Sequence, residues 1–201
     1  MQRSPTAVHR GPVSVVLPDE LLARVGFDLA VRPSDVDESE LPGEAPGAYV
    51  DRIALAKARV CARGPGEWVI AADTTVTIDG RILAKAADGT EATAMLRALR
   101  GRVHEVMTAF VVLGDRGEHV ERVTTAVAMV DYDDAAIADY VASNEWRGKA
   151  GAYALQGIAA ALVREVRGSV TNVIGLPLAE VCAALVALGG PRARFAAGSA
   201  A

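Results

Sequence analysis

Residues 68–85 constrain the fold more than any other segment, because a buried strand is followed at once by chemically active side chains. Trp68–Ala72 is a short apolar run, typical of a central strand that is buried on both faces. Asp73 and Thr74 follow it directly. In open α/β sheets, ligands bind beyond the carboxyl ends of such strands. The segment therefore predicts an α/β fold with an acid and a hydroxyl at the ligand-binding edge of its sheet.

A hairpin is expected after this strand. Asp79-Gly80 is a typical two-residue turn between the strand-like residues 75–78 and 81–83. The returning strand would carry Lys85 back toward Asp73. A carboxylate and an ammonium that face one cleft suit a metal-bound, negatively charged substrate. An enzyme is therefore the leading hypothesis.

Length and charge limit the remaining possibilities. A chain of 201 residues, about half of them apolar, can bury one full core. We expect a single domain at 13–188, a flexible N-terminus at 1–12 and a flexible tail at 189–201. The net charge of −4 argues against nucleic acid as a partner, because such binding needs a clustered basic surface. A small molecule or a protein is the expected partner.

The cysteines and the N-terminus bear on location. Cys61 and Cys182 lie at apolar positions of expected helices, without a second Cys or a His at metal-ligand spacing. Buried free thiols fit a reducing cytoplasm. No signal-peptide core and no apolar run of spanning length is present in the sequence. We therefore expect a cytoplasmic protein with no membrane partner.

Hydrophobic periodicity and turn residues divide the rest of the chain into strands and helices. The pattern predicts a mixed, twisted sheet with flanking helices. The further strands are expected at residues 13–16, 27–31, 104–113, 120–130 and 160–166, and the helices at residues 19–26, 46–62, 90–99, 133–143 and 177–188.

Two polar features of this pattern need an interpretation, namely a lysine within an apolar stripe and an acidic segment. Lys57 interrupts the apolar stripe of the expected helix 46–62, so its stem points toward the core side. It is either a lysine at the edge of the stripe with its amine in solvent, or a cation that lines a cleft. The acidic segment 34–40 is a solvated loop on composition alone.

Six blocks of the chain, in order, resemble the Maf family of nucleoside triphosphate pyrophosphatases. They are ELLARVGFDLAV with DVDES, YVDRIALAKA, AADTTVTIDGRILAK, LRGRVHEVMT, KAGAYALQG and GSVTNVIGLPL, and they extend from Glu20 to about Leu188. The DT and LQG forms are most similar to the branch that hydrolyses dTTP and UTP. The resemblance implies a fold like that of inosine triphosphatases, with a cleft between two lobes.

The resemblance also implies a reaction and assigns roles to acids. Water attacks the α-phosphorus of a nucleoside triphosphate, and pyrophosphate and the monophosphate are released. Asp73 matches the family's proton acceptor, whereas alone it could be an aspartate that caps a turn. Glu38 and Asp73 match positions that could contact a divalent cation, Mg²⁺ or Mn²⁺.

Further positions match the family's substrate-binding residues. Lys57 and Lys85 would bind the phosphate chain as point charges. Thr74 and Gln156 match positions that select the base, because a hydroxyl or an amide can pair with a pyrimidine edge. Their structural alternatives are a hydroxyl bonded to the backbone and a glutamine in solvent. His104, which opens a strand, is expected to be structural.

The chain departs from the family just before Glu20. A Ser-Pro-Arg-Arg loop normally precedes the first helix, whereas an ungapped alignment places Val15-Val16-Leu17-Pro18 there. Apolar side chains cannot replace arginines that bind phosphate, so weak activity is expected. A nucleotide-binding protein acting in cell division, or an enzyme for methylated guanine nucleotides, are the rival hypotheses. Since family members often form dimers, the resemblance allows a homodimer.

Overall fold

The computed structural model describes residues 13–16, 20–61 and 63–194. The chain combines strands and helices, as the sequence predicts. The elements are β1 (Val13–Val16), α1 (Glu20–Arg24), β2 (Leu29–Val31), α2 (Pro46–Val60), β3 (Trp68–Ile78), β4 (Arg81–Leu83), α3 (Gly89–Leu99), β5 (Val103–Gly114), β6 (Gly117–Met129), α4 (Asp134–Ala142), the 3₁₀ helix η1 (Ile158–Leu162), β7 (Val163–Arg167), α5 (Val170–Ile174) and α6 (Leu178–Ala187).

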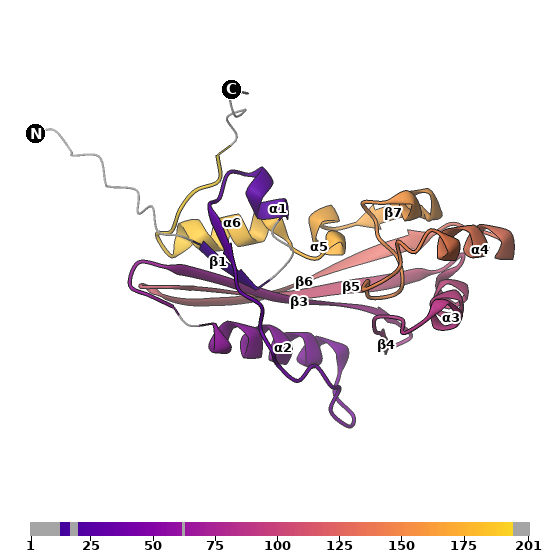
Figure 1. Cartoon of the computed structure of the whole chain (residues 1–201), viewed down its shortest axis with the longest axis horizontal. Coiled ribbons are helices and arrows are strands. Elements are labelled where there is room, and N and C mark those ends of the chain that lie inside the picture. The colour runs from indigo at the N-terminus through magenta and orange to yellow at the C-terminus, as the bar shows by residue number, and fades with distance from the viewer. Residues whose placement is uncertain (1–12, 17–19, 62, 195–201) are drawn as a thin grey trace, which may run out of the picture.

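The described strands form one mixed seven-stranded sheet. Its order is β2-β1-β3-β5-β6-β7, and β4 pairs with β3 off this path. Strand β1 is parallel to both β2 and β3, whereas β3, β5, β6 and β7 form antiparallel pairs. The long strands β5 and β6 form a hairpin that runs the length of the molecule (Figure 1). The structure confirms the predicted α/β fold with a mixed sheet.

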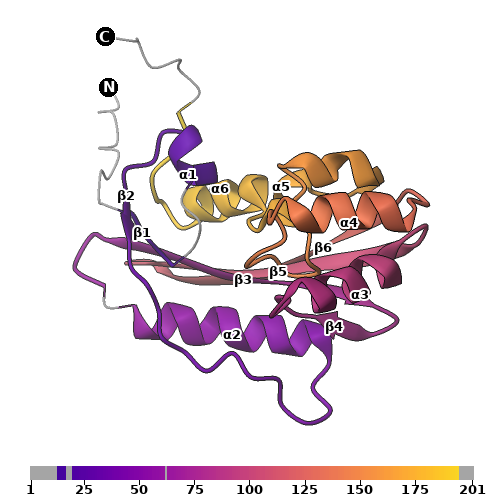
Figure 2. The ribbon, with the colours of Figure 1, turned by 45° about the vertical axis from the view of Figure 1, so that its right-hand side comes forward.

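Helices cover both faces of the sheet. Helix α2 lies along one face, and α1, α5 and α6 lie on the other (Figures 1 and 2). Helices α3 and α4 lie together at the end of β5 and β6 that is opposite to their hairpin turn. The apolar stripe of α2 explains its place, because Val50, Ala54 and Ala58 pack against Ala71 and Val111 of the sheet.

The other buried side chains form two larger cores, and these define two lobes. One core joins α6 and α1 to the first half of β3, with Leu22, Ile70, Phe110 and Leu185 fully buried. The other core joins α3 and α4 to the second half of β3 and to the ends of β5 and β6. Strand β3 therefore passes from one lobe to the other, and its middle lies between them.

Several details differ from the expected elements. Residues 158–162 form a 3₁₀ helix before β7, so the strand expected at 160–166 begins only at Val163. Helix α5 was not predicted; Ser169 caps its start by accepting a hydrogen bond from the Asn172 backbone. Cys61 follows α2 and Cys182 lies in α6, and both thiols are free but only half-buried, contrary to the expectation.

The predictions for the two ends of the chain have separate outcomes. The expected flexible N-terminus, residues 1–12, and residues 195–201 lie outside the described residues. The expected tail began at residue 189, but the Gly190 N–H donates to the Leu185 carbonyl at 2.7 Å and the Arg194 N–H donates to the Val25 carbonyl at 2.8 Å. The packed chain thus extends to Arg194. In the part of the chain that the structure describes, no helix has the length and apolarity to cross a bilayer.

Candidate active site

The site lies beside an interruption in one edge of β3. Strand β1 pairs with β3 only as far as Ala71, and β4 pairs with the same edge only from Val76. The opposite edge is paired with β5 from Val69 to Thr77. Among the described residues, no strand therefore covers residues 72–75 on the first edge. A cleft can open there without breaking the sheet.

Asp73 was expected to follow the end of its strand, and this detail is wrong. Strand β3 continues through Asp73 to Ile78, because the β-branched residues that follow suit a strand and both β4 and β5 pair with them. The strand that ends near Asp73 is β1, whose last pair is Val16 with Ala71. Asp73 is thus next to the carboxyl end of a parallel strand, but of the neighbouring one.

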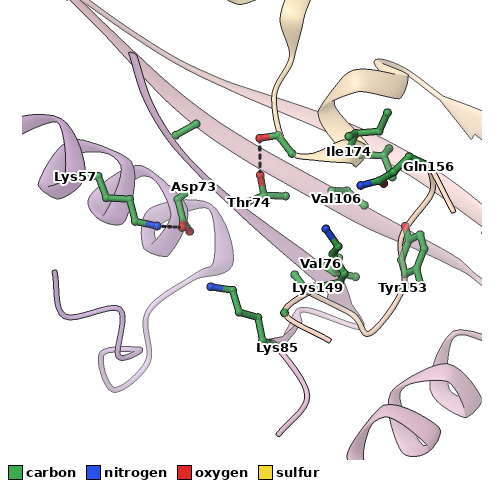
Figure 3. A pocket seen from close by; sticks show the side chains of 15 residues that line it. Lys57, Asp73, Thr74, Val76, Lys85, Val106, Lys149, Tyr153, Gln156 and Ile174 are labelled. Atoms are coloured by element: carbon green, nitrogen blue, oxygen red, sulfur yellow. Dashed lines mark hydrogen bonds and ion pairs between the residues drawn. The ribbon is translucent and has the colours of Figure 1, made fainter. Parts of the chain in front are cut away.

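A pocket of about 260 Å³ occupies this position and receives residues from both lobes (Figure 3). The alternation of side chains along β3 sends Asp73 toward α2 and Thr74 toward the segment after α5. Five of the six predicted site residues line the pocket, namely Lys57, Asp73, Thr74, Lys85 and Gln156. The sixth, Glu38, lines an adjoining pocket together with Asp73 and Lys85.

Charged side chains on the α2 side of the pocket form a compact ion-pair cluster. Lys57 Nζ lies 2.7 Å from Asp73 Oδ1 and 2.7 Å from Glu38 Oε1. Lys85 Nζ lies 3.5 Å from Glu38 Oε2. The side chains of Lys57 and Asp73 are only 11% and 10% exposed, so solvent screens their contact weakly. The amine of Lys57 is therefore held by two acids inside the cleft, and the solvent-directed alternative does not apply.

The environment shifts the pKa values of these groups. Burial raises the pKa of Asp73 above its usual value, and the charge of Lys57 limits the rise. Burial acts in the same direction on Glu38, but the hydrogen bond and charge of Lys57, with Lys85, outweigh it and lower the pKa of Glu38. Burial would lower the pKa of Lys57, yet Asp73 and Glu38 raise it. The site thus raises the pKa of Asp73 and lowers the pKa of Glu38, each relative to its usual value.

Glu38 reaches the cluster from a long loop that α2 holds in place. The Tyr49 hydroxyl donates to the Glu38 backbone carbonyl at 3.0 Å. The Arg52 guanidinium donates to both carboxylate oxygens of Glu44, at 2.7 and 2.6 Å, and to the Ser39 carbonyl at 2.9 Å. The acidic loop is therefore anchored beside the cluster and is more than a solvated segment. Sequence reasoning missed Tyr49 and Arg52, because their role depends on a tertiary contact.

Thr74 faces away from the ion-pair cluster and is bonded within the protein. Its hydroxyl lies 2.8 Å from the Thr108 hydroxyl and donates to the Gly175 carbonyl at 3.2 Å. These contacts match the structural alternative and connect β3 to the pocket wall after α5. Because the Thr74 hydroxyl donates its proton to Gly175, it can offer a ligand only an acceptor, and the bond fixes the position of Gly175.

Lys149 and Gln156 lie across the pocket from the cluster, on the segment between α4 and β7. Gln156 is exposed and lines both the main pocket and an adjoining one that α1 borders. Lys149 lines the same two pockets, and its side chain points into the main pocket (Figure 3). Sequence reasoning did not select Lys149 or its neighbour in the pocket, Tyr153.

His104 supports this wall from within the core. Its side chain is 2% exposed, and its Nε2 lies 2.8 Å from the Tyr153 hydroxyl. Burial lowers the pKa of His104 to about 4, so the ring is neutral at pH 7. His104 does not line the pocket, which agrees with the expected structural role.

The carboxylates near Lys57 are suitable in kind for a divalent metal ion. Mg²⁺ is commonly bound by one or two carboxylates, with water and substrate phosphates as the other ligands. Asp73 and Glu38 each have a carboxylate oxygen 2.7 Å from Lys57 Nζ. The two carboxylates are therefore close enough to bind one divalent cation together, once a ligand draws the Lys57 amine away. Within the described residues, no group of three or more His, Cys, Asp or Glu side chains forms a protein-only metal site.

The fold and the pocket define an α/β protein whose interlobe cleft presents two carboxylates and three lysines. A family model described as Maf-like protein matches residues 19–188. The chain therefore belongs to the Maf-like protein family. Every element from α1 to α6 lies within the matched range, and β1 precedes it.

Curated relatives cover most of the chain. A protein of Anaeromyxobacter dehalogenans named "dTTP/UTP pyrophosphatase" is 50% identical over 178 residues, which are 86% of this chain and 89% of that protein. A protein of Cereibacter sphaeroides with the same name is 47% identical over 180 residues, which are 89% of this chain and 93% of that protein. Among solved structures, the Staphylococcus aureus Ham1 protein matches with a TM-score of 0.44 and 16% identity over 60% of this chain and 72% of that chain.

The departure expected before Glu20 stays a prediction. The backbone of β1 ends at Val16, but Leu17 and Pro18 lie outside the described residues.

Proposed function

We propose that this protein hydrolyses nucleoside triphosphates, dTTP and UTP above all, to the monophosphate and pyrophosphate. The proposal rests chiefly on Asp73, a buried carboxylate 2.7 Å from Lys57 in a pocket that also holds Lys85. The names of relatives that are 47–50% identical support it. The rival substrate, a methylated guanine nucleotide, has no such support among those names.

Asp73 acts as the general base in this proposal. It removes a proton from water, whose oxygen bonds to the α-phosphorus while the bond from that phosphorus to the bridging oxygen breaks and pyrophosphate leaves. The raised pKa of Asp73 favours proton uptake compared with an exposed aspartate. Lys57 and Lys85 stabilise the negative charge that accumulates on the phosphate oxygens.

A divalent cation, Mg²⁺ or Mn²⁺, is the proposed cofactor, held by Asp73 and Glu38. When bound, it would neutralise phosphate charge and acidify water. Tyr49 and Arg52 keep Glu38 in position through the loop contacts described above. Thr74 and Gln156 are proposed to select the base, Gln156 by direct contact with its amide and Thr74 mainly through Gly175.

A substrate panel tests the proposal. Purified protein is incubated with Mg²⁺ or Mn²⁺ and each nucleoside triphosphate, including a methylated guanine nucleotide, and the release of pyrophosphate is measured. We expect release to be fastest with dTTP and UTP. The variant Asp73→Asn should lower kcat by roughly 100-fold or more, the effect typical of losing a general base.

The matched control is Asp79→Asn, which changes an exposed aspartate of the β3–β4 turn that pairs with Arg102 outside the pocket. It should stay within about twofold of wild type, because exposed ion pairs contribute little. Nucleotide binding without pyrophosphate release, or an Asp73→Asn variant as active as wild type, would favour the rival hypothesis of a binding protein in cell division. A homodimer, a cytoplasmic location and the lack of a nucleic-acid partner stay predictions.

A further inference from the structure

The three lysines of this chain share one location. The sequence has 21 basic residues, of which only Lys57, Lys85 and Lys149 are lysines. All three line the same pocket, whereas arginine occupies the basic positions elsewhere. A lysine ammonium is a compact point charge with three donors, suited to phosphate oxygens that change position during a reaction. This distribution suggests a common task for the three lysines.

Lys149 differs from the other two because it pairs with no carboxylate among the residues that the structure describes. Lys57 is paired with Asp73 and Glu38, and Lys85 is paired with Glu38. These four groups have no net charge together. Within the described residues, no carboxylate oxygen lies within the 4.0 Å salt-bridge distance of Lys149 Nζ. Lys149 therefore supplies the pocket's uncompensated positive charge.

The backbone around Lys149 is fixed against the hairpin that carries Lys85. Ala150 forms a bridge with Lys85, and the Gly151 N–H donates to the Leu83 carbonyl at 2.9 Å. Gly151 has a φ of +67°, and a Cβ added there would lie 2.9 Å from Val76 Cγ1, so only glycine permits this close contact with β3. Lys149 is thus held beside Lys85 by contacts with two strands.

We propose that Lys149 binds the phosphate chain of the substrate and the pyrophosphate product. This assignment rests on the proposed function and names a binding residue for it. A polyphosphate brings several negative charges into a pocket whose other charges cancel, and Lys149 can meet them without first losing a partner. Lys57 and Lys85 must in contrast share their donors with Asp73 and Glu38.

The competing role for Lys149 is a contact with the base, because Gln156 lines the same two pockets. Pyrophosphate has no base and therefore separates the two roles. If Lys149 contacts phosphate, its side chain should respond to inorganic pyrophosphate. If Lys149 contacts the base, its side chain should respond to nucleosides and nucleotides but not to pyrophosphate.

The test uses protein labelled with ¹³C at the lysine ε-carbon, which gives three side-chain NMR signals that Lys→Met variants assign. Inorganic pyrophosphate is titrated in the presence of Mg²⁺, and uridine is titrated separately. We expect the Lys149 signal to shift and saturate with pyrophosphate but not with uridine. In Lys149→Met, the Kd for pyrophosphate should rise roughly tenfold, the loss of one charge-assisted contact. Arg147→Met, which removes an exposed cation stacked on Trp146, should leave the Kd unchanged.

A stationary Lys149 signal, or an unchanged Kd in Lys149→Met, would overturn the assignment. A Lys149 shift with uridine would replace it with the base contact. These readouts need no turnover, so they are separate from the proposed function. An inactive protein whose Lys149 signal responds to pyrophosphate retains the assignment, and an active protein whose signal does not respond loses only the assignment.

Discussion

The two walls of the pocket are organised in opposite ways. The charge-paired wall, formed by Glu38, Lys57, Asp73 and Lys85, is a closed network in which each ammonium has a carboxylate. The open wall, formed by Thr74, Lys149, Tyr153 and Gln156, has an exposed amide and one cation that pairs with no carboxylate of the described chain. A network that is already neutral holds groups ready for chemistry, whereas unpaired donors remain available to a ligand.

The difference follows from the sheet. Alternation along β3 places Asp73 on the α2 face and Thr74 on the opposite face. The interruption between β1 and β4 then lets both faces reach one cleft. The comparison suggests a division of tasks, with proton transfer on the charge-paired wall and substrate recognition on the open wall.

The largest effect is expected on breaking the charge-paired wall at its centre. Lys57→Met leaves Asp73 and Glu38 facing each other without the shared cation, so burial and mutual repulsion raise the pKa of Asp73 further. The base is active when deprotonated, so the acidic limb of kcat/KM moves to higher pH. We expect roughly a 100-fold loss of kcat/KM, near the lower limit for acid–base catalysis.

The measurement for Lys57→Met is a pH–rate profile, with Arg59→Met, an exposed site on the same helix, as the control. An acidic limb at the wild-type position would contradict the role of Lys57.

A smaller effect is expected from a variant that removes the support of the Glu38 loop without changing the charge-paired wall itself. Arg52→Gln removes the bonds to Glu44 and Ser39 that hold the loop of Glu38. The Mg²⁺ concentration for half-maximal activity should rise by up to roughly tenfold, the lower end of the effect of losing a direct partner of a metal ligand, because Arg52 positions Glu38 only through the neighbouring Ser39. Activity is measured against Mg²⁺, with the exposed Arg59→Gln as the control. An unaltered Mg²⁺ requirement would contradict the proposal that Glu38 binds the metal ion.

The smallest effect concerns the support of the open wall and is a change in stability. The pKa of His104 is about 4 in the folded protein, compared with 6.5 for a histidine in the unfolded chain. The neutral form of His104 therefore contributes stability that is fully present above pH 6.5 and is lost as the pH falls toward 4. Acidification to about pH 4 should remove as much as about 3 kcal/mol of the free energy of unfolding through this residue. His104→Phe should lose this dependence.

Urea unfolding of wild type and His104→Phe between pH 7 and pH 4 provides the measurement. The free energy of unfolding of wild type should fall relative to that of His104→Phe as the pH falls from 7 to 4. A constant difference would mean that His104 is not held neutral beneath Tyr153.

Much of the fold could be predicted because its long elements have clear periodicity. Strands β5 and β6 and helices α2 and α3 lie within a few residues of the expected ranges. Strand β3 was divided at Asp73, because a carboxylate interrupts an apolar pattern and the sequence does not reveal that a neighbouring strand ends there. Helix α5 has only five residues and too short a repeat to detect.

The site was only partly predictable from sequence. The hairpin turn placed Lys85 near Asp73, and the stripe position of Lys57 turned it inward, so local patterns carried that information. Arg52 looked like any helical surface cation, because its role depends on a loop that folds back over α2. Lys149 could have been found from lysine usage alone, since the chain has only three lysines and the other two were already selected.

The division between the walls is tested most directly by measuring turnover and pyrophosphate binding on the same two variants. Asp73→Asn should abolish most pyrophosphate release yet retain pyrophosphate binding, because it removes the proposed base and leaves Lys57, Lys85 and Lys149 in the pocket. Lys149→Met should show the reverse pattern, with weakened binding and a kcat closer to wild type. Equal losses of binding and turnover in both variants would contradict the account.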